Sequence, residues 1–257
     1  MTKSNFILTL SVLVIAISCN RTTNKDLDEA ETFQFPQITD RYKNDTLELT
    51  SVIWVNYGDH NPYYFGKLTD SISIERYLRP MMPTPLPPGA DTSEWDFEPK
   101  KGKFDEYFLD WMDNREFKRK DSVNLFIKVD TTQIINNDGR KAFPVLIQNI
   151  TTDTIYVGYG NQVPIITEAK SKNGEWKPIE EQYTYMCGNG LHSIILPPNE
   201  FVLTSELIYS GNFKTKLRIK MGNNYSEEFN GTINESQFES EWDNNGERKT
   251  LPNNGYN

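Results

Sequence analysis

The chain is poor in the residues that build metal cages and disulfide networks, with only two cysteines and two histidines among its 257 residues. That is too few for a Cys-rich zinc site, a disulfide framework or a multi-histidine metal cage. No long hydrophobic run follows residue 17, which excludes a polytopic membrane protein. Acidic residues outnumber basic ones, and the net charge of −9 would repel the phosphates of nucleic acid. We therefore expect a globular body with no resident metal or cofactor and no nucleic-acid partner.

The motifs that organise common active sites are also missing: no GxSxG, P-loop, GxGxxG or HExxH occurs. A serine triad would need His60 or His192, and Ser193, next to His192, would point to the opposite face of a strand. The doublets Glu180-Glu181 and Glu227-Glu228 diverge in the same way and are ordinary on a solvated face. Hydrolysis by two separate carboxylates needs no motif, so a carboxylate-dependent hydrolase stays open as an alternative.

A short apolar segment opens the chain. Lys3 supplies a positive charge, and residues 6–17 follow without any charged side chain. As a helix this segment would rise about 18 Å, which is less than the roughly 30 Å of hydrocarbon in a bilayer. The pattern is typical of an export signal, which we place at residues 1–18.

The segment ends in Ala16, Ile17, Ser18 and Cys19, and a polar stretch follows. This resembles the lipobox of bacterial lipoproteins, in which the cysteine is lipidated and becomes the mature N-terminus. The resemblance implies lipidation of Cys19 and a membrane contact through that anchor, which several acyl chains make stable. With Cys19 lipidated, Cys187 would have no partner for a disulfide within the chain.

Acidic residues follow the lipobox, at Asp26, Asp28, Glu29 and Glu31. The stretch is similar to that of surface-exported lipoproteins of the Bacteroidota. A solvated, disordered linker is the alternative explanation of the same charges. We expect a lipid-anchored protein of the cell envelope, at the outer membrane. Whether it faces the periplasm or the cell surface stays open.

The body is predicted to be mainly β, in two parts. After a flexible tether at residues 19–40, residues 41–120 form a β-hairpin or meander with a proline-rich loop at residues 80–88. In the same part, Phe104, Tyr107, Phe108, Trp111 and Met112 follow the spacing of one helical face. This spacing predicts one short amphipathic helix between residues 104 and 117.

Residues 121–240 contain many short apolar runs separated by turn residues, which is typical of an antiparallel β-sandwich. The region resembles an immunoglobulin-like sandwich without the paired cysteines of antibody domains, a likeness that names no function. In residues 216–221 apolar and basic residues alternate, so this strand is predicted to have one wet face. Residues 241–257 are predicted to be a flexible tail.

Two loop regions combine aromatic residues with a histidine and are our candidate binding loops. Their members are Tyr57, His60, Tyr63 and Tyr64 in the first, and Tyr183, Tyr185 and His192 in the second. Tyrosines could stack on a sugar or a peptide, and packing in the core or at its rim is the ordinary alternative. Met186, Cys187 and His192 could also hold copper, although a turn beside a buried thiol explains them as well.

A third pattern concerns modification. Asp followed by Ser or Thr and then by Ala, Ile, Leu, Met, Thr or Val resembles the O-glycosylation acceptor of Bacteroidota. It occurs five times, where composition predicts fewer than one, at Thr46, Ser71, Ser122, Thr131 and Thr154. Turn and strand preferences enrich the same triplet, so both explanations stand.

Together these features favour a non-enzymatic binding or interaction module for a protein or a glycan, which uses loops at one end of a rigid sheet scaffold. The alternatives are the secreted hydrolase and an inhibitor or immunity-type lipoprotein. The inhibitor would act through a protruding loop such as residues 81–88.

Overall fold

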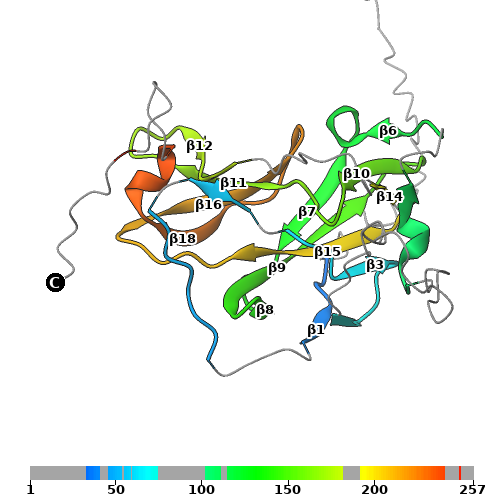
Figure 1. The fold of residues 1–257 in the computed structure, drawn as a ribbon, viewed down its shortest axis with the longest axis horizontal. Coiled ribbons are helices and arrows are strands. Elements are labelled where there is room, and N and C mark those ends of the chain that lie inside the picture. The colour runs from blue at the N-terminus through cyan, green and yellow to red at the C-terminus, as the bar shows by residue number, and fades with distance from the viewer. Residues whose placement is uncertain are drawn as a thin grey trace, which may run out of the picture. The chain divides into compact units, whose positions relative to one another are not determined.

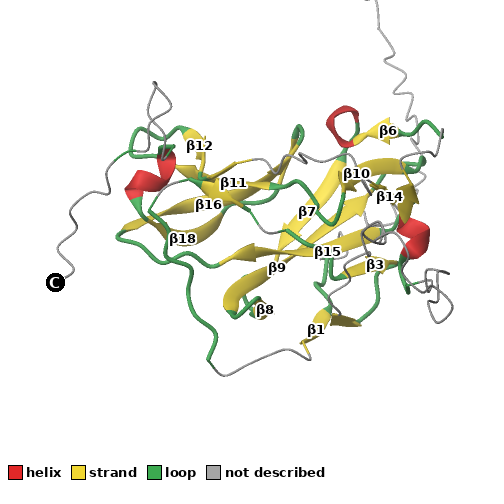
Figure 2. Cartoon of the chain, in the orientation of Figure 1, coloured by secondary structure: helices red, strands yellow, loops and turns green. Residues whose placement is uncertain are grey.

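The structure is a computed structural model that describes residues 33–40, 46–53, 55–58, 60–74, 102–110, 115–181, 192–240 and 249. Strands and short 3-10 turns make up its regular structure, so the prediction of a mainly β, sandwich-like protein is confirmed (Figures 1 and 2). Residues from Phe35 onward form one compact unit. Within the described ranges, no helix is long and apolar enough to cross a membrane.

The first large sheet has the order β3-β15-β9-β7, and β8 pairs with the N-terminal end of β9. All its pairings are antiparallel. Its strands are β3 (Tyr64–Gly66), β7 (Leu125–Val129), β8 (Ile135–Asn137), β9 (Arg140–Asn149) and β15 (Phe201–Leu207). Every residue of β15 is buried, as expected for a strand covered on both faces.

The second large sheet has the order β12-β11-β16-β17, and β18 pairs with β16 beside β17. Its strands are β11 (Ile166–Lys170), β12 (Trp176–Pro178), β16 (Phe213–Met221), β17 (Asn224–Tyr225) and β18 (Phe229–Ile233). Leu217, Ile219 and Met221 are buried, while the residues between them are more exposed. The predicted alternation of residues 216–221 therefore produces one buried and one solvated face.

The remaining strands form one four-stranded sheet, β5-β14-β10-β6, and the two small pairs β1-β4 and β2-β13. Their bounds are β1 (Gln37–Asp40), β2 (Asn56–Tyr57), β4 (Ser71–Ile74), β5 (Phe108–Asp110), β6 (Lys118–Arg119), β10 (Ile155–Tyr159), β13 (Glu180–Glu181) and β14 (His192–Leu196). β2, β3 and β5 come from residues 41–120 and pair with β13, β15 and β14 of the later part. The two predicted parts thus share sheets.

The predicted helix between residues 104 and 117 is wrong where the structure describes it. Asp105–Tyr107 form a single 3-10 turn, and Phe108–Asp110 continue as β5 on the edge of β14. The aromatic stripe is nevertheless buried, because Phe104, Tyr107 and Phe108 pack around Phe65 with ring centroids 4.8–5.6 Å away. Pairing with β14 and this packing outweigh the helical spacing. Residues 111–114 and the proline-rich loop lie outside the described ranges.

Phe65 should contribute strongly to the stability of the core shared by the sheets, since it is 2% exposed and contacts three aromatic rings. Phe65→Ala is expected to lower the free energy of unfolding by about 3–5 kcal/mol through lost contacts and a cavity. Leu68→Ala, at a residue that is 42% exposed, should change it by less than about 0.5 kcal/mol. Urea unfolding followed by circular dichroism measures both. Two separate transitions, or a loss below about 1 kcal/mol for Phe65→Ala, would contradict the shared core.

Candidate functional site

A histidine and two glutamates meet in the interior between the sheets. His60 lies in the loop before β3, Glu180 lies in β13, and Glu206 lies near the end of β15. Their exposed fractions are 2%, 2% and 0%. One ring nitrogen of the histidine and one carboxylate oxygen of each glutamate lie within 4.8 Å of one another.

Hydrogen bonds fix two members of this cluster. His60 Nδ1 lies 2.8 Å from Ser205 O, and because a carbonyl only accepts, Nδ1 carries the hydrogen. His60 Nε2 faces Glu180 Oε2 at 3.1 Å. Glu180 also accepts hydrogen bonds from Tyr209 OH at 2.6 Å and from Thr167 N at 2.9 Å. The carboxylate of Glu180 therefore has a donor on each oxygen.

The charges of the cluster are set by burial and by its members. Burial alone would lower the pKa of His60, but Glu180, with help from Glu206, raises it to about 9. Burial alone would raise the pKa of Glu180, but His60 and the hydrogen bonds from Tyr209 and Thr167 lower it. Burial raises the pKa of Glu206 well above its usual value, and the nearby charge of Glu180 raises it further.

Glu206 differs from Glu180 in its partners. Neither of its carboxylate oxygens meets a donor at hydrogen-bond geometry, although the Thr167 hydroxyl lies close enough to lower the pKa of Glu206. A buried polar group left in this state costs about 1–3 kcal/mol, so it calls for a physical reason. The arrangement could hold a proton or a cation. None of the three residues lines either of the two hollows described below, so the cluster is not placed to meet a substrate there.

A second feature lies on the solvated side of the second large sheet. Lys214, Lys216, Arg218 and Lys220 alternate along β16 with its inward residues, and Lys170 of β11 joins them. We call these five residues the basic face. No described carboxylate lies within ion-pair distance of Lys214 or Lys216, whereas Arg218 and Lys220 pair with Glu168 at 2.6 and 3.6 Å. The cluster of positive charge is notable in a chain of net charge −9.

Aromatic rings pack against Arg218 in the basic face. The guanidinium carbon of Arg218 lies 4.4 Å from the ring centroid of Trp176 and 4.1 Å from that of Tyr225. Lys170 lies over the same Trp176 ring, at 5.6 Å. Cation–π contacts of this kind fix the direction of a long side chain at a solvated site. Arg218 is thus held in place by both rings and by Glu168.

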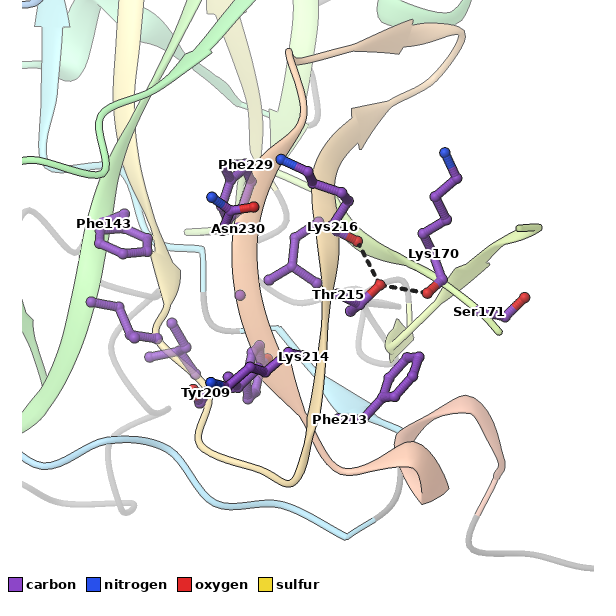
Figure 3. A pocket seen from close by; sticks show the side chains of 15 residues that line it. Phe143, Lys170, Ser171, Tyr209, Phe213, Lys214, Thr215, Lys216, Phe229 and Asn230 are labelled. Carbon is purple, nitrogen blue, oxygen red and sulfur yellow. Dashed lines mark hydrogen bonds between the residues drawn. The ribbon is translucent and has the colours of Figure 1, made fainter. Parts of the chain in front are cut away.

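Two hollows border the second large sheet. The first, of about 700 Å³, is mostly apolar and includes Lys170, Lys214 and Lys216 (Figure 3). Its apolar walls are Phe143, Leu207, Tyr209, Phe213, Leu217 and Phe229. The second, of about 730 Å³, includes Lys220 of β16 and Ile166, its register partner in β11. Its other lining residues include Arg115, Glu116, Phe117, Arg119, Asp121, Tyr156 and Tyr159.

The structure separates the predicted binding-loop residues. His60 and Tyr63 are 2% exposed, and Tyr63 OH lies 3.3 Å from Ser205 Oγ beside the buried cluster. Tyr64 is half-buried and stacks on Phe201. His192 lies in β14, 4% exposed and edge-on to Phe108. Tyr57 is placed on β2.

Several other predictions lie outside the described residues: lipidation of Cys19, the binding residues Tyr183 and Tyr185, and the copper alternative with Met186 and Cys187. The glycosylation candidates Thr46, Ser71, Ser122 and Thr131 are exposed, and Thr154 is half-buried. They are accessible enough for glycosylation to remain a prediction.

Sequence reasoning missed Glu206 and assigned Glu180 to a solvated face. The available signal was a lone carboxylate within the otherwise uncharged run of residues 201–209. A near-continuous apolar run is typical of a strand covered on both faces, where a charged residue is buried too. All of β15 is buried, so Glu206 has no solvated face to occupy.

The raised pKa of His60 predicts how stability depends on pH. The folded protein holds this proton more tightly than the unfolded chain, so the resulting stability is complete below pH 6.5 and is lost as the pH rises towards 9. The free energy of unfolding should fall by roughly 3 kcal/mol between pH 6 and pH 9.5. Deprotonation of Glu206 acts in the same direction.

Urea unfolding at a series of pH values, in buffer with EDTA, measures this dependence. His60→Gln should flatten the profile above pH 6.5, whereas His192→Gln, at the other buried histidine, should leave its slope unchanged. A flat profile in the unmodified protein would show that His60 is not charged in the folded state.

No known protein family, curated protein or solved structure matches the chain. The function therefore has to be inferred from the side chains themselves.

Proposed function

We propose that this is a lipid-anchored protein of the bacterial cell envelope that binds an extended acidic glycan along β16 and does not turn it over. The observation that carries the proposal is the basic face, whose cations repeat along β16. The lipobox-like end of the export signal, with Cys19, supports the anchor.

The spacing of the basic face suits a linear polyanion. Alternate residues of a strand lie about 7 Å apart, so Lys214 and Lys220 are separated by roughly 20 Å. Between them the charges repeat regularly on one face, as do the acidic groups of a charged polysaccharide. Among the described residues, Glu168 is the only carboxylate within ion-pair distance of these cations.

The chemistry of the face favours a glycan over a folded protein. Interface cores between proteins are depleted in lysine, whereas this face presents four lysines. On the basic face itself, the rings of Trp176 and Tyr225 lie beside Arg218. Sugar rings carry apolar C–H faces together with polar groups, so an acidic sugar could use both kinds of side chain.

The two alternative functions, a hydrolase and an inhibitor, have less support. In the buried cluster two carboxylates converge, but neither lines a hollow, which a hydrolase acting through them would require. The carboxylates Glu116 and Asp121 do line the second hollow, so loss of polymer length is a useful control. The loop at residues 81–88, on which an inhibitor would depend, lies outside the described residues.

Removal of two lysines should weaken glycan binding. Lys214→Ser with Lys216→Ser is expected to raise the Kd for polygalacturonate about tenfold, because each lost charge contact contributes about 0.5–1 kcal/mol. Binding by the unmodified protein should also weaken as salt is added. Isothermal titration calorimetry at two salt concentrations measures both effects.

The matched control is Lys67→Ser with Lys103→Ser, which removes the same charge at exposed positions beside β3 in the first large sheet, outside both hollows. It should change the Kd by less than twofold, and neutral dextran should not bind. An equal loss in both double variants would indicate a response to net charge alone. Shortening of the polymer during incubation, seen by size-exclusion chromatography, would favour the hydrolase.

The anchor is tested separately. In a bacterial host, the protein should partition into the detergent phase of Triton X-114, since several acyl chains bury many CH₂ groups. Cys19→Ser should move it to the aqueous phase, and Cys187→Ser should not. An unmodified Cys19 thiol in the intact mass of the N-terminal peptide would contradict the anchor.

A further inference from the structure

We propose that His60, Glu180 and Glu206 form a binding site for one divalent transition-metal ion of the Zn²⁺ type, buried between the sheets. The site is independent of glycan binding on the basic face. A bound ion would connect three separate parts of the fold, because its ligands come from the loop before β3, from β13 and from β15.

The ligand set suits such an ion. One imidazole nitrogen and two carboxylate oxygens lie within 4.8 Å of one another, so small side-chain movements would bring all three into contact with one ion. Imidazole with carboxylate binds Zn²⁺ or Mn²⁺, whereas Ca²⁺ prefers oxygen ligands alone. The ligands lie far apart in sequence, which explains why no spacing motif indicates the site.

His60 is already oriented as a ligand. Its Nδ1 donates to Ser205 O at 2.8 Å, and this leaves Nε2 directed at Glu180. Metal-binding histidines commonly hold their second nitrogen by such a bond to a backbone carbonyl. The donors Tyr209 OH and Thr167 N orient Glu180 in the same manner.

Glu206 supplies an independent observation. It is 0% exposed, its carboxylate faces the cluster, and neither oxygen has a donor at hydrogen-bond geometry. The Thr167 hydroxyl is the donor beside it, and it does not reach hydrogen-bond geometry with either oxygen. An acceptor pair left open toward a histidine and a second carboxylate is what a cation requires.

Charge balance agrees with this assignment. Two ionised glutamates and a neutral histidine carry two negative charges, which one divalent ion neutralises. Without the ion, two protons shared within the cluster would supply the same charge. Burial then implies that the ion enters as the chain folds, because a solvent path to the cluster is lacking among the hollows described above.

The test is refolding with metal. Protein unfolded in urea with EDTA, freed of EDTA and refolded with an excess of Zn²⁺ should retain about one ion per chain after gel filtration, measured by inductively coupled plasma mass spectrometry. Its Tm should exceed that of protein refolded with EDTA. Co²⁺ in place of Zn²⁺ should give visible absorption typical of a low-coordinate nitrogen and oxygen site.

Glu206→Gln keeps the shape of the side chain and mimics its protonated form, so the variant should fold while retaining at least tenfold less Zn²⁺. Glu227→Gln, at a glutamate whose side chain is 81% exposed, should retain as much as the unmodified protein. The proposal is overturned if the unmodified protein retains less than about 0.1 ion per chain. It is equally overturned if Glu206→Gln, folded by circular dichroism, retains the same amount. If that variant does not fold, the stoichiometry and the Co²⁺ spectrum of the unmodified protein decide.

Discussion

The buried carboxylate of Glu180 is the contact on which the arrangement of the sheets depends. It receives His60 from the loop before β3, Thr167 N from β11 and Tyr209 OH from the segment after β15. The first and last of these segments flank the first large sheet, β11 belongs to the second, and all three come from distant parts of the sequence. A carboxylate at this depth is tolerated because donors meet both of its oxygens and because an opposite charge lies beside it. The loss of any one donor would leave a buried charge incompletely paired.

The same contacts connect the interior to the outer surface. In β11, Thr167 faces the cluster through its backbone N–H, and the next residue, Glu168, pairs with Arg218 on the basic face. Tyr209 binds Glu180 through its hydroxyl and also lines the first hollow. The cluster therefore positions both β11 and one wall of the hollow. A rigid interior of this kind would present the lysines of β16 at fixed spacing, which favours binding of an extended ligand with little loss of conformational entropy.

Local pattern was enough to predict the mainly β fold and the two faces of β16, because alternation of side chains is a property of any strand. It failed at residues 104–117, where the spacing of Phe104, Tyr107 and Phe108 fits a helix as well as a packed turn and strand. It also failed at Glu180 and Glu206, because their burial depends on which strands cover them. Pairing of β13 with β2, and of β15 with β3 and β9, is a tertiary fact with no signature in the spacing of residues.

The most direct measurement of the central claim, that this protein works by contact along β16, is an NMR titration with an acidic oligosaccharide such as tetragalacturonate. The account predicts that backbone amide shifts between Lys214 and Lys220, and in β11 and β17 beside them, change in proportion to ligand added, while those of β3 and β4 stay in place. Changes confined to other parts of the chain, or none at concentrations well above the Kd measured with the polymer, would contradict it.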